Sequence, residues 1–205
     1  MARTNVAVEE TVAYMLADEA ARQNKTLYAF TNELLKTSLR ICREGGNLNE
    51  IYPAWRFSKM TREVDTVPLP GDLLEKMISR LSTLDEGWLL KTWQEEGVRI
   101  GTYLHMYEPT FERLSALVKE MEFLLPIKRL DILRVERQDG GRYIVRAIGA
   151  GLSPSSTKCA EALLQGLLNT YAMTVVSSRV SEGIIELVVE VMQKEEGEAK
   201  PTDQP

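Results

Sequence analysis

The stretch Arg3–Leu39 sets a short alternating segment directly before two amphipathic helical patterns, and this order most constrains the fold. Val6 and Val8 alternate with other residues, so an extended strand would point both valines to one face. The opposite face would carry Arg3, Asn5 and Ala7. One such strand with two short helices is too small to bury a core alone. The pattern therefore predicts pairing with a second copy of the chain.

Two helices are expected after the strand. Val12, Leu16 and Ala20 recur every four residues along the first. Thr26 is placed to cap the second helix, and Asn24 to end the first in a left-handed conformation. The apolar face of the second helix consists of Leu27, Phe30, Leu34 and Leu35.

These residues resemble the ribbon-helix-helix family of DNA-binding proteins. The resemblance is carried by VAVEE, the Val12/Leu16/Ala20 stripe, the NKTL turn and the FTNELL run, in the family's order and spacing. In that family, strands from two chains form an antiparallel ribbon that enters the major groove of DNA. The resemblance implies base reading by Arg3, Asn5 and Ala7. It implies a phosphate clamp at Lys25-Thr26-Leu27.

The side-chain chemistry suits two of the three reading positions. Arg3 can donate a bidentate fork to guanine, and Asn5 can satisfy adenine. Ala7 is shorter than the family's usual polar side chain and could only touch a thymine methyl, and Glu9 stands where the family often has proline. At the second helix, free N–H groups and the positive dipole end suit a phosphate, with Lys25 adding charge.

A solvated dimer edge is the alternative interpretation of this module, since such modules also serve purely for dimerisation. Its charges balance, so nonspecific DNA affinity is expected to be modest. Up to Gly46, six cations are balanced by six anions. The cations are Arg3, Arg22, Lys25, Lys36, Arg40 and Arg43, and the anions are Glu9, Glu10, Asp18, Glu19, Glu33 and Glu44.

Composition sets limits on the remainder. The chain has 205 residues, 44% hydrophobic and 27% charged, enough for a small module (1–46) and one well-cored domain (71–192). No apolar run approaches the roughly 20 residues that span a bilayer, and no signal-peptide pattern opens the chain. Cys42 and Cys159 form no CxxC pair. Reduced thiols in a cytoplasmic protein are therefore expected.

Residues 47–70 read as a linker with a basic and aromatic segment, bounded by Gly45-Gly46 and by Pro68 and Pro70. Two interpretations stay open. Its cations could grip a flanking phosphate backbone, or its aromatic side chains could pack the connector onto the following domain while the charges face water. The residues concerned are Trp55 and Phe57, with Arg56, Lys59 and Arg62 at three-residue spacing.

The second half reads as α+β, making the whole chain α+β. Helices are expected at about 72–82, 86–105, 109–124 and 155–171, and strands at 130–135, 143–148, 174–180 and 184–191. The turns Asp139-Gly140-Gly141 and Ser181-Glu182-Gly183 predict two hairpins. The polar residues 193–205 are expected to be a disordered tail.

This order resembles the 4-vinyl reductase-like domain, a small-molecule-binding module. The resemblance covers about 90–191 and rests on EEGVRIGTYL, GRYIVRAIGAG, KCAEALLQGLLNTY and the two closing strands; the family's cysteine-rich ending is absent. It implies an apolar ligand pocket by fold analogy. The candidate lining is Trp93, Ile144, Leu163, Leu167 and Ile185. If side chains fill that space, these residues form a core and the domain is a dimerisation device.

No residue set indicates an enzyme, a metal site or a cofactor. His105 is the single histidine and nothing places it near Cys159, so a nucleophilic triad or a four-ligand zinc site is not expected. Gly149-Ala150-Gly151 lacks the lysine of a phosphate loop, and a turn with a serine cap for the next helix explains it more simply.

The sequence thus predicts a homodimeric, or higher even-numbered, sequence-specific DNA-binding protein, a transcriptional regulator that binds double-stranded DNA. Its C-terminal domain would dimerise or sense a small hydrophobic ligand, and no membrane partner is expected. The alternative is a scaffold or antitoxin-like partner that uses the N-terminal module for assembly. Antitoxins usually carry short tails that fold on a toxin, whereas this extension has the apolar periodicity of its own core.

Overall fold

A computed structural model describes residues 5–120 and 131–192 of the chain. The chain divides into two compact units, Met1–Pro53 and Ala54–Pro205, which we describe separately. The fold is α+β, and its sheet is antiparallel.

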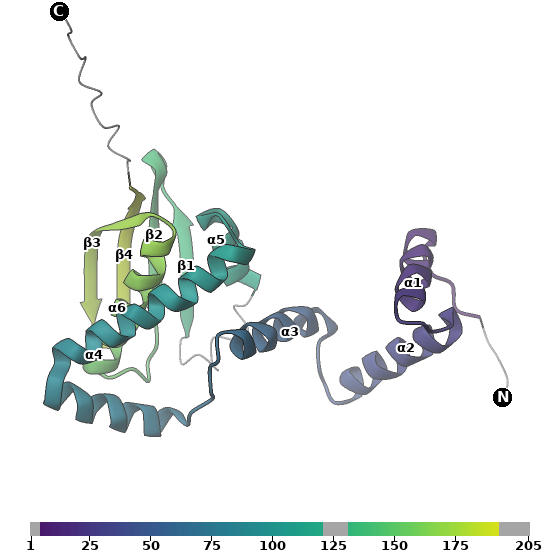
Figure 1. Cartoon of the computed structure of the whole chain (residues 1–205), viewed down its shortest axis with the longest axis horizontal. Helices are drawn as coiled ribbons and strands as arrows, with labels where there is room; N and C mark the ends of the chain where they lie inside the picture. The colour runs from purple at the N-terminus through teal and green to yellow at the C-terminus, as the bar shows by residue number, and fades with distance from the viewer. Residues whose placement is uncertain (1–4, 121–130, 193–205) are drawn as a thin grey trace, which may run out of the picture. The chain divides into compact units, whose positions relative to one another are not determined.

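The first unit is a helical pair, α1 (Glu10–Arg22) and α2 (Leu27–Arg43), joined by a tight turn (Figure 1). The predicted caps are confirmed. Asn24 has a left-handed φ of 53°, and Thr26 Oγ1 accepts a hydrogen bond from Ala29 N at 3.2 Å. Residues 5–9 form neither helix nor strand in the single chain, so the expected strand is not seen. A lone strand has no neighbour to satisfy its backbone, which accounts for this difference.

Helix α3 (Leu48–Glu63) occupies most of the segment that we expected to be a linker. Pro53 lies inside it, at the boundary between the two units. Phe57 and Met60 pack against the core of the second unit. Of the two interpretations of this segment, packing by Phe57 onto the following domain is confirmed, whereas Trp55 stays exposed.

The second unit begins with the long helix α4 (Gly71–Tyr107), which is interrupted at Asp85. The Asp85 backbone is not helical, and its Oδ1 accepts a hydrogen bond from Trp88 N at 2.8 Å, so Asp85 caps a new helix. The two helices predicted at 72–82 and 86–105 therefore exist and meet at this residue. Helix α5 (Phe111–Glu120) follows; the rest of the third predicted helix, 121–124, lies outside the described residues.

Two hairpins form the sheet, in the strand order β1-β2-β4-β3. Strands β1 (Ile132–Arg137) and β2 (Arg142–Ile148) pair across the short helix η2 (Asp139–Gly141). After α6 (Pro154–Thr170), strands β3 (Met173–Ser181) and β4 (Ile184–Val191) form the second hairpin. The predicted hairpins and helix are confirmed. Leu130 and the predicted tail at 193–205 lie outside the described residues.

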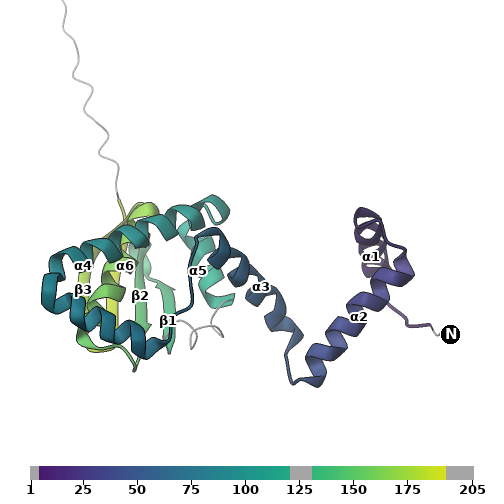
Figure 2. The same cartoon turned by 60° about the horizontal axis from the view of Figure 1, so that its bottom comes forward.

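The two faces of the sheet differ in chemistry. One face is covered by helices and carries the core, with Val145, Leu187 and Val189 fully or almost fully buried (Figures 1 and 2). The opposite face carries charged cross-strand pairs. Arg146 contacts Glu136 at 2.9 Å and Glu186 at 2.7 Å. In β4, the buried Ile185, Leu187 and Val189 alternate with the half-buried Glu186 and Glu190, so one face is buried and the other partly wet.

Three glycines allow α4 and α6 to pack with their backbones in contact. A Cβ placed on Gly97 would lie 2.1 Å from the Leu163 carbonyl oxygen, and one on Gly166 would lie 2.1 Å from the Gln94 oxygen. At Gly101 the same atom would lie 2.4 Å from Thr170 Oγ1. Because backbone atoms cannot move aside singly, any larger residue at Gly97 or Gly166 must separate the two helices.

We expect Gly166→Ala to lower the free energy of unfolding by about 1–3 kcal/mol, because the added methyl overpacks this contact. Chemical denaturation followed by circular dichroism measures the change. Gly87→Ala is the matched control, because its Cβ would be 3.5 Å from Asp85 Oδ1, an ordinary contact. Equal stability of the two variants would contradict the close packing.

Candidate nucleic-acid interface

The predicted base-reading segment is exposed where the structure describes it. Arg3 lies outside the described residues, while Asn5 and Ala7 are exposed. Val6 is 68% exposed and Val8 53%, although both are apolar. The single chain therefore leaves most of the apolar surface of these valines in water. Pairing with a second strand would bury that surface and so stabilise the paired state.

At the start of α2, the predicted phosphate clamp consists of Lys25, Thr26 and Leu27. Thr26 caps the helix, so its hydroxyl already satisfies one backbone N–H. Lys25 Nζ lies 2.5 Å from Glu33 Oε2 and 5.9 Å from the centre of the Phe30 ring. The ammonium is thus held beside the helix start, and a phosphate would have to compete with Glu33 for it.

Arg56, one of the three cations proposed to contact the DNA backbone, is instead bound within the second unit. Its Nη2 lies 2.6 Å from Glu108 Oε1, and its Nη1 lies 3.3 Å from Glu120 Oε2. Arg113 Nε holds the other Glu108 oxygen at 3.0 Å. Glu108 is only 8% exposed, so Arg56 neutralises a buried carboxylate. A role for Arg56 at DNA does not fit this geometry.

The other two cations have weaker attachments. Lys59 Nζ lies 3.9 Å from Glu63 and over the rings of Trp55 and Tyr107, at 5.9 and 5.5 Å from their centres. Arg62 is exposed, and its Nε donates to Ser58 O at 3.2 Å. The structure therefore does not present the three cations as one basic face.

Two contacts at its C-terminal end also fasten α3 to the second unit. The Tyr103 hydroxyl bonds to Glu63, and Arg99 donates to the carbonyl oxygen of Val64. Burial and the Glu63 carboxylate raise the pKa of Tyr103, so the phenol stays protonated as a donor. No sequence pattern indicates the role of Glu108, because an acidic residue at a helix end is usually exposed to solvent.

The residues predicted to line a ligand pocket do not surround one space. Trp93 packs in a cluster with Ile78, Leu89 and Cys159, while Leu167 and Ile185 belong to the main core. The Leu163 carbonyl lies in the α4–α6 contact. Ile144 pairs with Val188, whereas Ile185 pairs with Ala147, so Ile144 and Ile185 point to opposite faces of the sheet. This arrangement favours the packed-core alternative, and a ligand pocket at these residues stays a prediction.

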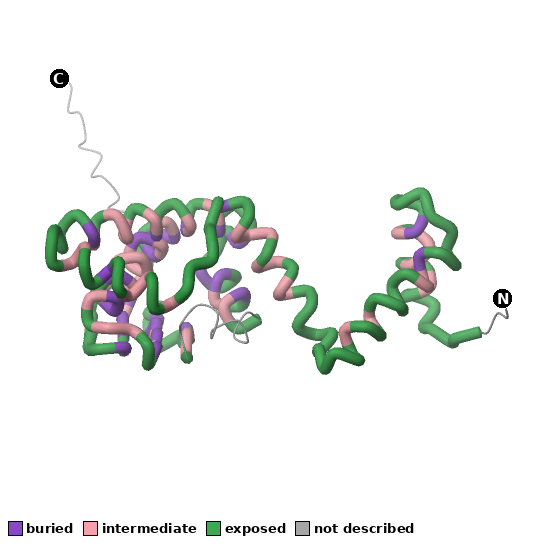
Figure 3. The backbone as a smooth tube through the Cα atoms, turned by 90° about the horizontal axis from the view of Figure 1, so that it is seen from below, coloured by how far each residue is buried: buried purple, intermediate pink, exposed green. Residues whose placement is uncertain are grey.

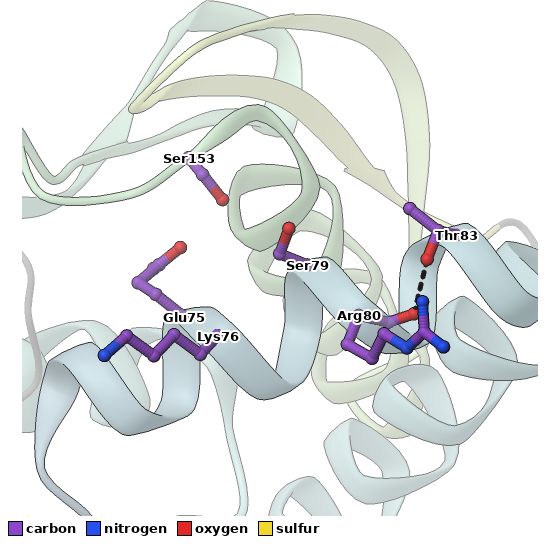
Figure 4. Close-up of a pocket in the computed structure, with 6 residues that line it drawn as sticks. All are labelled: Glu75, Lys76, Ser79, Arg80, Thr83 and Ser153. Carbon is purple, nitrogen blue, oxygen red and sulfur yellow. Dashed lines mark hydrogen bonds between the residues drawn. The ribbon is translucent and has the colours of Figure 1, made fainter.

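A depression of about 550 Å³ lies elsewhere, between α4 and the start of α6. It is open to solvent, and each of its lining residues, Glu75, Lys76, Ser79, Arg80, Thr83 and Ser153, has a polar or charged group. In Figure 4, Glu75 and Ser79 rise from α4 toward Ser153, while Lys76 and Arg80 extend away from each other along the helix. Ser153 already caps α6, accepting from Ser156 N at 3.2 Å, as the sequence predicted.

Of the groups that could support catalysis, Cys159 and Tyr171 are buried, whereas His105 is exposed. Burial raises the pKa of the Cys159 thiol to about 11, and that of Tyr171 to about 12, with Glu108 adding to the second effect. His105 stacks edge-on against Tyr171, with ring centres 5.0 Å apart. Among the described residues, no three His, Cys, Asp or Glu side chains gather as metal ligands would. Nor, within that part of the chain, is any helix long and apolar enough to cross a membrane.

Comparisons with known proteins leave the family open. No family model matches the chain, and no curated protein matches it. Among solved structures, one match comes from a study entitled "Probing the function of heme distortion in the H-NOX family". It shares 12% identity and a TM-score of 0.38, covering 67% of this chain and 87% of that chain. A likeness this weak carries no argument about fold or function.

We expect Arg56→Met to lower the free energy of unfolding by about 1–3 kcal/mol, because the buried Glu108 carboxylate loses its strongest partner. Urea denaturation of the full chain measures the change. Arg62→Met, on the same helix but exposed, should change it by less than about 0.5 kcal/mol. If Arg56→Met were equally silent, Arg56 would be available for other partners.

Proposed function

We propose that this chain is a homodimeric, sequence-specific DNA-binding protein, a transcriptional regulator that reads the major groove with a two-stranded ribbon. The observation that carries the proposal is the apolar surface that the first unit leaves uncovered. In its described residues only Ala20 and Phe30 are buried.

The uncovered side chains follow both helices and the segment before them. A tube coloured by burial shows α1 and α2 as exposed over most of their length, with short intermediate and buried stretches (Figure 3). The exposed large apolar residues of this region are Val6, Val8, Val12, Tyr14, Met15, Leu27, Tyr28, Leu34, Leu35 and Leu39. A patch of this extent marks an interaction surface. Association with an identical copy would bury the same residues on both chains.

A paired ribbon supports base reading through residue alternation. When two antiparallel strands pair at 5–8, Val6 and Val8 face the helices of the dimer, and Asn5 and Ala7 face outward with Arg3. A ribbon of this width fits the major groove. Asn5 then contacts adenine and Arg3 contacts guanine, while Ala7 adds only an apolar contact.

The start of α2 supports backbone gripping. Its first N–H groups and dipole attract a phosphate, and Lys25 stands beside them. Because Lys25 is paired with Glu33 in the free chain, phosphate binding exchanges one anionic partner for another. This exchange limits the affinity for nonspecific DNA.

Substitutions in these two groups should separate base reading from backbone gripping. Binding is measured by fluorescence anisotropy at stated salt, using a site found by footprinting genomic fragments. Arg3→Ala and Asn5→Ala should each cost about 1–3 kcal/mol on that site and little on random DNA. Lys25→Ala should weaken both alike and lower the salt slope by about one unit.

Glu33→Gln is the matched control for Lys25. It releases the ammonium without altering the helix start, so affinity for both DNAs should rise at low salt. Equal losses on all DNAs for Arg3, Asn5 and Lys25 variants would reduce the module to a nonspecific binder. No binding at low salt would overturn the proposal in favour of an assembly scaffold.

The role of the second unit follows from its packing. The five candidate pocket residues pack in clusters or lie on opposite sheet faces, which favours a packed core over a site for a hydrophobic effector. Residues 54–205 nevertheless form a unit with its own core, unlike a short tail that folds on a toxin. Dimerisation is the remaining role that we assign to this unit.

A further inference from the structure

The first half of α4 carries two apolar stripes, and only one of them is covered. Leu74, Ile78 and Leu81 pack inward, in the cluster that includes Cys159. A second stripe of Leu73, Met77 and Leu84 faces solvent, and Leu69 precedes it just before the helix. Leu73 and Met77 are 46% and 45% exposed, and Leu84 is 65% exposed.

We infer that this exposed stripe (Leu69, Leu73, Met77 and Leu84, with the exposed Arg80 between them) contacts the same stripe of a second copy in an antiparallel arrangement. Residues 73, 77, 80 and 84 lie within about 60° of one another around a helix with 3.6 residues per turn. They form a single narrow seam. The inference rests on the proposed dimer, because two joined N-terminal modules hold two second units at high local concentration.

The charges beside the stripe indicate both which partner covers it, a second copy of the chain, and in which direction the helix of that copy runs. Asp72, Lys76 and Arg80 form the neighbouring row at four-residue spacing, which meets the stripe at Arg80. In a parallel two-fold pair, this row would lie on opposite sides of the two helices, so Asp72 of one copy would not meet Arg80 of the other. In an antiparallel pair, Asp72 of each chain lies beside Arg80 of the other, while Lys76 extends between them into water. The surface is therefore complementary to itself only when the second helix runs in the opposite direction.

The same arrangement fixes the register. With the two-fold axis beside Met77, Leu69 faces Leu84 of the second copy, and Leu73 lies against the aliphatic stem of the second Arg80. The two Met77 side chains then meet at the axis. An interface of this kind is isologous, so it closes at two copies.

Cysteine cross-linking of the full chain tests this register. In a Cys42→Ser background, Met77→Cys should form a disulfide-linked dimer with copper–phenanthroline as oxidant, because the two thiols lie across the axis. Leu73→Cys is the control, since it is equally exposed but about 10 Å from its copy along the helices, beyond disulfide reach. Cys159 is buried and remains in both variants. Equal cross-linking at the two positions, or none at Met77→Cys, overturns the inference.

A charge exchange tests the direction within the Met77→Cys chain. Asp72→Arg should slow cross-linking several-fold, because the introduced arginine of one copy would lie beside Arg80 of the other and the two cations would repel each other. Adding Arg80→Asp should restore the rate, because opposite charges face each other again. A double variant as slow as the single one would overturn the antiparallel pairing.

The outcomes also separate this inference from the proposed function. Site-specific DNA binding without Met77→Cys cross-linking would leave the ribbon module in place and reject the contact between second units. Cross-linking without DNA binding would support that contact and reject the DNA-binding proposal.

Discussion

Backbone contact between α4 and α6 is the constraint on which the second unit depends. Gly97 and Gly166 each meet a carbonyl oxygen of the opposite helix, so the helices lie as close as their main chains permit. This closeness sets α6 over the inner sheet face, where Leu168 and Leu187 are buried. The first half of α4 begins before the break at Asp85 and packs through Leu74, Ile78 and Leu81, which leaves its other apolar stripe uncovered.

The first unit also has to bury apolar side chains, but its own two helices do not cover them. Two helices of 13 and 17 residues bury only Ala20 and Phe30 among the described residues, which is too little to offset the entropy of ordering them. A second copy would supply the missing interior. The proposed ribbon then follows from the same requirement, because its valines need an apolar partner and its polar residues face outward.

Local signals in the sequence predicted much of the fold. Thr26, Asn24 and Ser153 mark helix ends through bonds within a few residues, and they do so in the structure. Long-range relations could not be obtained in this way. The strand order places β2 beside β4, and their register sets Ile144 and Ile185 on opposite faces although both lie in apolar runs. The Arg56–Glu108 pair joins residues 52 positions apart, so spacing on one helix could not reveal it.

Hydrogen–deuterium exchange of the full chain at two concentrations tests the central claim, that the first unit needs a second copy to be stable. Sedimentation locates one concentration where the chain is dimeric and another where it is monomeric. The account predicts that amides of α1 and α2 lose protection on dilution, while those of α4 and α6 keep it. Full protection of α1 and α2 in the monomer would contradict it, since the helical pair would then be stable alone.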